Sequence, residues 1–294
     1  MYDVRRLNML LEVHERGTLA AAAQTLHLTP SAISQQLSAL EKEVGTPLLT
    51  HVRRRYQLTE AGRVLIEGTR SVLSELDTMK TRIERLTGEP SGTVRIAIFQ
   101  SAALAVLPKA LEYLAQHAPQ VALHAVQIEP EIGLTMTKSR EFDITIAEAY
   151  PHHFIPEMSE LSYDLLTHDP LHLMVPTSSA VEHVADTHAL PWVLERPGNT
   201  SREWAINRCR SFGFDPTIRY EIDDVITHVH LVKAGLAAAM VPHFIVQAID
   251  SLDGVRLIDH EEQSRKIFVV TRTESRDQLS ITAVREALQH AVNH

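Results

Sequence analysis

The stretch from residue 18 to residue 58 most constrains the fold of this chain, because it places two short helices around a tight turn. Thr18 is a favourable helix N-cap and precedes an alanine-rich run. Pro30 suits the first position of a second helix, in which apolar side chains recur every three or four residues until Gly45. This pattern predicts a helix-turn-helix, whose second helix can lie in a DNA major groove.

The polar side of the second predicted helix carries short hydroxyl and amide side chains, which can hydrogen-bond the edges of bases. An arginine triplet follows in a predicted hairpin, where it would suit phosphate or minor-groove contacts. The alternative is a small helical bundle with a solvated basic loop. If the stretch reads DNA, the expected contact residues are Thr18, Thr29, Pro30, Ser31, Ser34, Gln35, Arg53, Arg54 and Arg55.

These residues resemble the N-terminal winged helix-turn-helix of LysR-type transcriptional regulators. The match runs without insertion from Leu7 to Gly62 and includes the segments Gly17-Thr18-Leu19, Ala32-Ile33-Ser34 and Leu58-Thr59-Glu60-Ala61-Gly62. The sequence departs from the family at Leu49 and His51, where Phe and Arg are usual. The resemblance implies a transcriptional regulator that binds double-stranded operator DNA with partial dyad symmetry.

Residues 59–87 contain no proline and are predicted to form one helix, about 40 Å long at the helical rise per residue. Apolar residues repeat along it at steps of three, four and seven, which is typical of a coiled-coil seam. Two paired copies would place two DNA-binding domains on one duplex, so we expect a homodimer or homotetramer. The seam residues are Leu65, Val72, Leu76, Met79, Ile83 and Leu86.

The net charge of −9 is divided unevenly along the chain. Residues 1–58 hold seven Lys and Arg against five Asp and Glu, whereas residues 88–294 hold 16 against 27. Only the N-terminal part could therefore be attracted to a polyanion. Cys209 is the single cysteine, which excludes an internal disulfide and fits a reducing cytoplasm. We interpret it as a small helix residue.

Strands and helices alternate after a hinge at residues 88–92, which indicates an α/β fold, and the β-α-β-α-β order of residues 93–147 predicts a largely parallel sheet with helices on both faces. Two lobes crossed by two strands would resemble the periplasmic-binding-protein-like effector domain of the same family. The predicted organisation is a DNA-binding domain (1–58), a linker and dimerisation helix (59–87) and an effector domain (88–294). Lobe I would span about 91–164 and 268–294, and lobe II about 165–267.

Ligands of open α/β sheets bind beyond the carboxyl ends of the strands. We therefore expect a small-molecule effector between the lobes. Helix N-termini there could hold an anion, whereas Glu148 could repel carboxylates or bind a cation, so the charge of the effector stays open. Ser101 and Thr200 could equally be ordinary helix caps. The expected effector residues are Gln100, Ser101, Ala102, Pro130, Glu148, Asn199, Thr200, Thr227 and His228.

Other functional classes receive less support. The 17 histidines invite a metal-sensing hypothesis, but no cysteine accompanies them and pairs such as His228 and His230 point to different sides of a helix. The chain has no P-loop, nucleophile elbow or zincin motif, so an enzyme is the least favoured class, and no cofactor is expected. An exported solute-binding protein would need a signal peptide, and neither a signal peptide nor a bilayer-spanning run is present.

Overall fold

The computed structural model describes residues 2–26, 28–52, 55–153, 155 and 158–293. The chain divides into two compact units, of which the first holds residues 1–89 and the second most of residues 90–294. Each unit has its own hydrophobic core. Among the described residues, no helix is both long enough and apolar enough to cross a membrane.

The first unit is built on a helix-turn-helix followed by a hairpin. Thr18 and Thr29 cap the two helices of the motif, and each hydroxyl accepts a backbone N–H at 3.2 Å. Gly45 adopts a φ of 83°, a left-handed conformation that ends the second helix. The elements are α1 (Val4–Arg16), α2 (Leu19–Thr25), α3 (Pro30–Val44), β1 (Leu49–Val52) and β2 (Arg55–Leu58).

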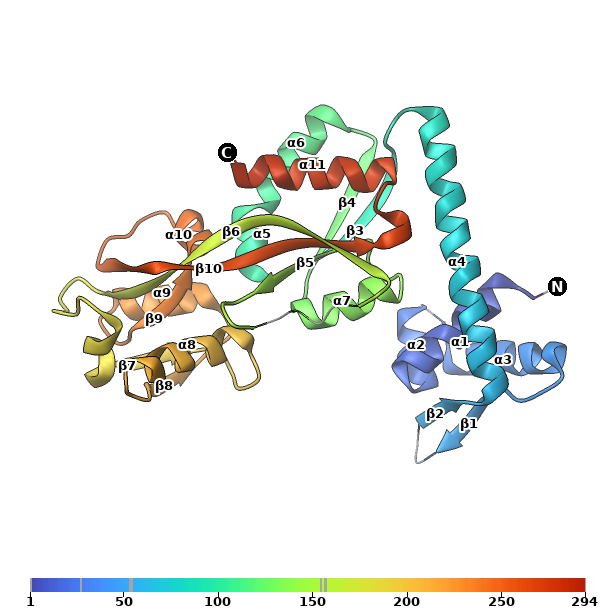
Figure 1. Cartoon of the computed structure of the whole chain (residues 1–294), viewed down its shortest axis with the longest axis horizontal. Coiled ribbons are helices and arrows are strands. Elements are labelled where there is room, and N and C mark those ends of the chain that lie inside the picture. Colours follow the sequence, from blue (N-terminus) through green and yellow to red (C-terminus); the bar gives the residue numbers. More distant parts are fainter. Residues whose placement is uncertain (1, 27, 53–54, 154, 156–157, 294) are drawn as a thin grey trace. The chain divides into compact units, whose positions relative to one another are not determined.

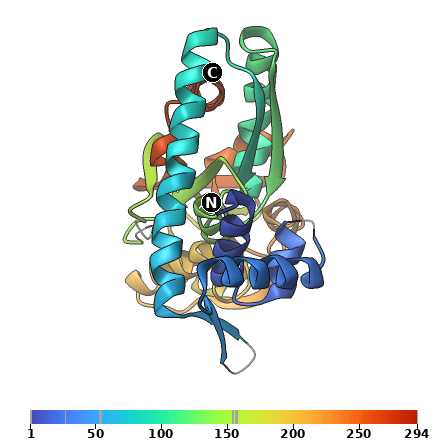
Figure 2. The ribbon, with the colours of Figure 1, turned by 90° about the vertical axis from the view of Figure 1, so that its right-hand side faces the viewer.

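The long helix α4 (Glu60–Thr87) follows the hairpin without interruption, as Figure 2 shows. Its first turns belong to the core of the first unit, because Ile66 and Leu73 are buried there and Leu65 packs beside them. Leu65 thus also contacts this core, and its place in a pairing seam stays a prediction. The other predicted seam residues are exposed in the chain.

Gly62 allows α4 to approach the hairpin closely. A Cβ atom added there would lie 2.2 Å from the Leu48 carbonyl oxygen, which is backbone and cannot move aside cheaply. We expect Gly62→Ala to destabilise the first unit by about 1–3 kcal/mol through this clash. Gly68→Ala is the matched control, because nothing lies within 4 Å of its added Cβ. Urea unfolding should show Gly68→Ala unchanged or more stable, and equal effects of both changes would contradict this packing.

The second unit is organised around a six-stranded sheet of order β4-β3-β5-β10-β6-β9. Two strands, β6 and β10, run antiparallel to each other and link the two lobes (Figure 1). The strand bounds are β3 (Gly92–Ile98), β4 (Val121–Gln127), β5 (Ile144–Ala149), β6 (Leu161–Pro176), β7 (Pro191–Leu194), β8 (Thr217–Glu221), β9 (Ala239–Pro242) and β10 (Val255–Arg272).

Helices cover the sheet in both lobes. Lobe I carries α5 (Gln100–Ala105), α6 (Leu107–His117), α7 (Pro130–Lys138) and α11 (Leu279–Asn293). Lobe II contains the parallel pair β7–β8 with α8 (Thr200–Ser211), α9 (Val225–Lys233) and α10 (His243–Ala248). Short 3₁₀ helices lie at Val184–Ala189 and Thr273–Ser275.

The sheet confirms the parallel order predicted for its first three strands, since β3 pairs parallel with both β4 and β5. The whole sheet is mixed, because the chain enters lobe II along β6 and returns along β10 in the opposite direction, antiparallel to β5. One helix prediction is wrong. The sequence pattern predicts a single helix over residues 102–117, but the structure has two helices separated at Val106, close to Pro108, which lacks a backbone N–H.

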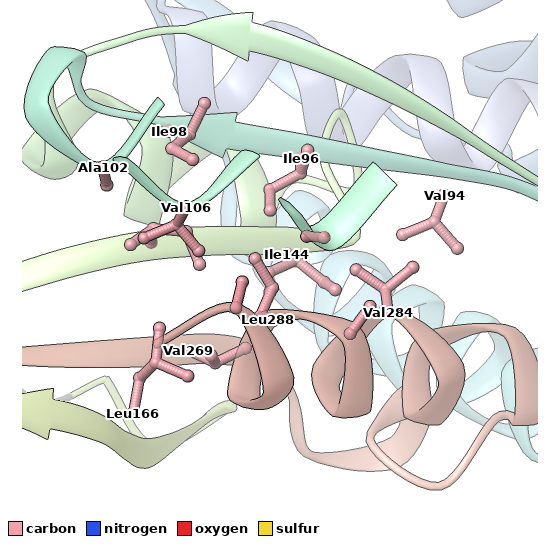
Figure 3. Packing of buried hydrophobic residues seen from close by; sticks show 14 of the residues in the cluster. Val94, Ile96, Ile98, Ala102, Val106, Ile144, Leu166, Val269, Val284 and Leu288 are labelled. Atoms are coloured by element: carbon pink, nitrogen blue, oxygen red, sulfur yellow. The ribbon is translucent and has the colours of Figure 1, made fainter. Parts of the chain in front are cut away.

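The core of lobe I forms between β3 and the C-terminal helix. Val94 and Ile96 from β3 face Val284 and Leu288 from α11, with Ile144 between them, as Figure 3 shows. These side chains are almost fully buried. The C-terminal helix and β10 thus complete a lobe that begins with β3.

Candidate functional site

The outer face of α3 presents short polar side chains. Pro30, Ser31, Ser34 and Gln35 are exposed, while the opposite stripe of Ile33, Leu37 and Leu40 is buried in the core of the first unit. The buried stripe fixes which way the helix faces, so the exposed groups form one surface. Hydroxyl and amide groups in this arrangement can donate to and accept from base edges.

Gln36 differs from its neighbour Gln35. The Gln36 side-chain oxygen accepts a hydrogen bond from Arg6 Nε at 2.9 Å, so this amide is engaged within the protein. The amide of Gln35 has no such contact with the described residues. Of the two adjacent glutamines, Gln35 is therefore the one available to a ligand.

The Glu41 side chain of α3 holds the start of the hairpin. One carboxylate oxygen of Glu41 accepts the N–H groups of Leu48 and Leu49, at 2.8 and 3.3 Å. His51 packs edge-to-face on Tyr56, with ring centroids 5.1 Å apart. Leu49 and His51, the two departures from the family pattern, thus still contribute to a packed hairpin, since Leu49 also contacts the core.

The structure describes only some of the other expected DNA contacts. Thr18 and Thr29 serve as helix caps, and the Thr29 hydroxyl also shares a hydrogen bond of 3.0 Å with the Ser31 hydroxyl. Arg53 and Arg54 lie outside the described residues, and so does the side chain of Arg55. The arginine triplet therefore stays a prediction.

A cavity of about 390 Å³ lies between the two lobes of the second unit, a volume within the usual range for small-molecule sites. Four of the expected effector residues line it: Pro130 and Glu148 from lobe I, and Asn199 and Thr200 from lobe II. Asn199 also caps α8, since its side-chain oxygen accepts the Ser201 N–H at 2.9 Å. The remaining lining residues are Glu129, Glu131, Arg196, Pro197, Gly198 and Asp223.

Arg265 of β10 joins the two lobes beside this cavity. Its side chain is almost fully buried and donates to Asp169, through Nε at 2.8 Å, and to the Glu148 carboxylate. It also donates to Ser101 Oγ at 2.7 Å and to the Tyr150 hydroxyl at 3.2 Å. Of these residues, Ser101 and Glu148 are expected effector residues, whereas the sequence pattern does not predict a role for Arg265 or Asp169.

Burial raises the pKa of Glu148 to about 7, and the nearby Glu195 and Asp169 carboxylates add to the effect while Arg265 opposes it. The Glu148 carboxyl group is therefore poised to change charge near neutral pH. Burial also raises the pKa of Tyr150, so its hydroxyl stays protonated. Burial disfavours the charged form of Arg265, yet Glu148 and its other neighbours raise the pKa of the guanidinium, which stays a cation.

The raised pKa of Glu148 predicts a pH-dependent stability. Folded Glu148 holds its proton up to about pH 7, whereas the unfolded side chain releases it near 4.5, so the unfolded state binds fewer protons between these values. Stability should fall as pH rises through this window. Glu12, whose pKa burial also raises to about 7, acts in the same direction.

Glu148→Gln should remove the Glu148 part of this dependence, on the order of 1–3 kcal/mol. Urea unfolding at pH 5.5 and 7.5 measures it, and the Glu12 part is common to both proteins. A pH slope identical to that of the unaltered protein would contradict the assignment.

The other expected effector residues lie away from the lining of this cavity. Gln100 bridges the lobes, since its amide donates to Asp224 Oδ1 at 2.6 Å and accepts the Val225 N–H at 3.1 Å. Ala102 packs in the lobe I core (Figure 3). Thr227 donates to Asp224 at 2.6 Å, and the buried His228 ring contacts the Ile222 carbonyl oxygen at 2.6 Å.

The structure also bears on the single cysteine and on the metal-sensing hypothesis. Cys209 is buried in lobe II, and burial raises the pKa of its thiol to about 12, so it is an unreactive core residue. Among the described residues, no group of three or more His, Cys, Asp or Glu side chains is arranged to hold a metal ion.

Two family models cover almost the whole chain. A model described as a bacterial regulatory helix-turn-helix protein of the lysR family matches residues 4–63. A model described as the LysR substrate binding domain matches residues 87–293. The chain belongs to the LysR family of transcriptional regulators. It is accordingly a DNA-binding regulator with a helix-turn-helix and an effector-binding domain.

Relatives and solved structures agree with this membership. The transcriptional dual regulator GltC of Bacillus subtilis is 26% identical over 82% of this chain and 80% of its own length. MetR of Escherichia coli is 26% identical over the whole chain and 92% of its own length. A full-length OxyR variant from Pseudomonas aeruginosa shares the fold, with a TM-score of 0.72 at 16% identity over 98% of this chain and 95% of that chain.

Proposed function

We propose that this LysR-family regulator reads an operator through the exposed face of α3 and senses a small effector in the cavity between the lobes. The observation that carries the first part is the orientation of α3, whose buried stripe leaves Pro30, Ser31, Ser34 and Gln35 facing outward. Thr18, Thr29 and the arginine triplet of the hairpin would hold the phosphate backbone. A solved relative, full-length CbnR, is described in complex with its target DNA.

Self-association through α4 would set the spacing of two DNA-binding domains. Val72, Leu76, Met79, Ile83 and Leu86 lie along one side of this helix and are all exposed in the single chain, Leu86 by 87%. An apolar stripe of this length on a helix is costly to leave in water. We infer a homodimer, or a homotetramer built from such dimers, that acts on DNA in the cytoplasm and has no enzymatic activity.

The effector part of the proposal rests on the cavity and on the contacts that join the lobes around it. Pro130, Glu148, Asn199 and Thr200 would contact the ligand, and Gln100 and Ser101 would couple it to the lobe closure. A ligand can favour one arrangement of the lobes only if it binds that arrangement more tightly. The ratio of its two affinities limits how far it can change the affinity for DNA. By linkage, DNA must change the affinity for that ligand by the same factor.

Gln35→Ala tests the proposed reading face. If Gln35 addresses a base, its loss should cost about 1–3 kcal/mol of operator binding and relax the preference at one position. Gln36→Ala is the matched control, because the Gln36 amide is engaged by Arg6. Binding to a randomised operator library measures both. An unchanged affinity and preference for Gln35→Ala, or equal losses for both variants, would reject the assignment.

A further inference from the structure

The cavity between the lobes is dominated by carboxylates. Glu129, Glu131, Glu148 and Asp223 line it, and Arg196 is the one cation among the described lining residues. The charge of Arg196 is already paired, because its guanidinium forms an ion pair with Asp223 and its backbone N–H donates to the same carboxylate at 3.0 Å. An anionic ligand would therefore meet negative charge without a free cation to balance it.

Arg265 does not alter this balance. It lies between two buried carboxylates, Asp169 and Glu148, and its remaining N–H donors go to Ser101 and Tyr150. Its guanidinium also lies over the Phe99 ring, 5.1 Å from the centroid. This cation is enclosed by its own partners and is not presented to the cavity.

Glu195 supplies an independent observation. It follows β7 directly and is only 7% exposed, yet among the described residues no hydrogen-bond donor or cation contacts its carboxylate. It directly precedes Arg196, which lines the cavity, and its charge contributes to raising the pKa values of Glu129 and Glu148, two carboxyl groups of that lining. A bound cation would give this carboxylate a partner of opposite charge.

We propose that the effector is an organic cation carrying a primary ammonium or guanidinium group. The inference rests on the proposed effector-sensing function and specifies its ligand class. Glu129 and Glu148, which line the cavity, accept from the cationic group, while Glu131 and the nearby Glu195 favour it electrostatically. A bare metal ion fits less well, because no three of the described carboxyl, imidazole or thiol groups converge to ligate one.

The test uses charged probes with uncharged isosteres. Arginine, lysine, agmatine and putrescine are titrated into the full-length protein by calorimetry at pH 7.5, beside citrulline, norleucine, succinate and Mg²⁺. We expect at least one cation to bind, with its uncharged isostere at least about tenfold weaker, as the loss of a charged hydrogen bond implies. Absence of binding by all four cations, or preferential binding of succinate or Mg²⁺, would overturn the proposal.

Two variants assign the binding to the cavity. Glu129→Gln should weaken the bound cation by about ten- to a hundredfold, the effect of losing a charge-assisted partner in the cavity lining. Glu203→Gln is the matched control, because Glu203 carries the same charge on exposed α8 surface outside the cavity lining. Equal affinity in both variants would show that the cation binds elsewhere.

Operator binding by the same preparation distinguishes a wrong ligand class from a wrong proposed function. Operator protection without cation binding rejects the ligand class and leaves the regulator intact. Loss of both rejects the proposed function itself.

Discussion

Arg265→Ala is expected to destabilise the effector domain by about 3–5 kcal/mol, the largest effect of any single substitution considered. The change would leave the Asp169 and Glu148 carboxylates buried without their shared cation. It would also remove the Ser101 contact that links β10 to the start of α5. Urea unfolding followed by tryptophan fluorescence measures the effect, since both tryptophans lie in lobe II.

Arg196→Ala is the control for this prediction. Arg196 also forms an ion pair with a carboxylate, Asp223, but its side chain is 76% exposed. Solvent screening limits such pairs to about 0–1 kcal/mol. If Arg265→Ala were no more destabilising than Arg196→Ala, the buried network would not hold the lobes together.

The second large effect concerns the exposed stripe of α4. Replacing Leu76 and Ile83 together by Glu should convert the protein to monomers, because four like charges would enter a paired apolar seam. Losing the second DNA-binding domain should lower operator affinity by about 10²–10⁴-fold, the usual gain from two linked binding sites. Sedimentation measures the assembly and fluorescence anisotropy the DNA affinity.

Ser71→Glu is the control, since Ser71 is exposed on α4 but lies off the stripe. It should leave both assembly and affinity close to those of the unaltered protein. A double variant that stays dimeric would place the interface elsewhere in the chain.

Local patterns predicted the first unit well. Thr18, Thr29, Pro30 and Gly45 mark helix ends, and the structure uses each of them at the predicted helix boundary. These signals are local because a cap and its acceptor lie within a few residues. The distinction between Gln35 and Gln36 could not be predicted, because it depends on Arg6, 30 residues away from Gln36.

The second unit was predicted less completely. The sequence pattern predicts strands over residues 169–175 and 266–272, which are only parts of β6 and β10, because polar residues such as His168 and Ser264 interrupt the apolar pattern where the strands cross between lobes. Their pairing runs antiparallel, which element order alone does not reveal.

The inter-lobe network was the least predictable part. Arg265 meets Asp169 across 96 residues and Ser101 across 164, and no local spacing signals such a contact. One available signal was a charged residue beside an apolar strand, since Arg265 immediately precedes the predicted strand from Lys266. A charge in that position must find a partner if the strand is buried.

The central claim, that this chain reads a specific operator as a paired regulator, is tested most directly by a footprint on the DNA flanking its own gene at two salt concentrations. The account predicts protection over a partial dyad, with half-sites about one helical turn or a multiple apart, that weakens steeply as salt rises. Folded, dimeric protein that protects no sequence at either salt concentration would contradict it.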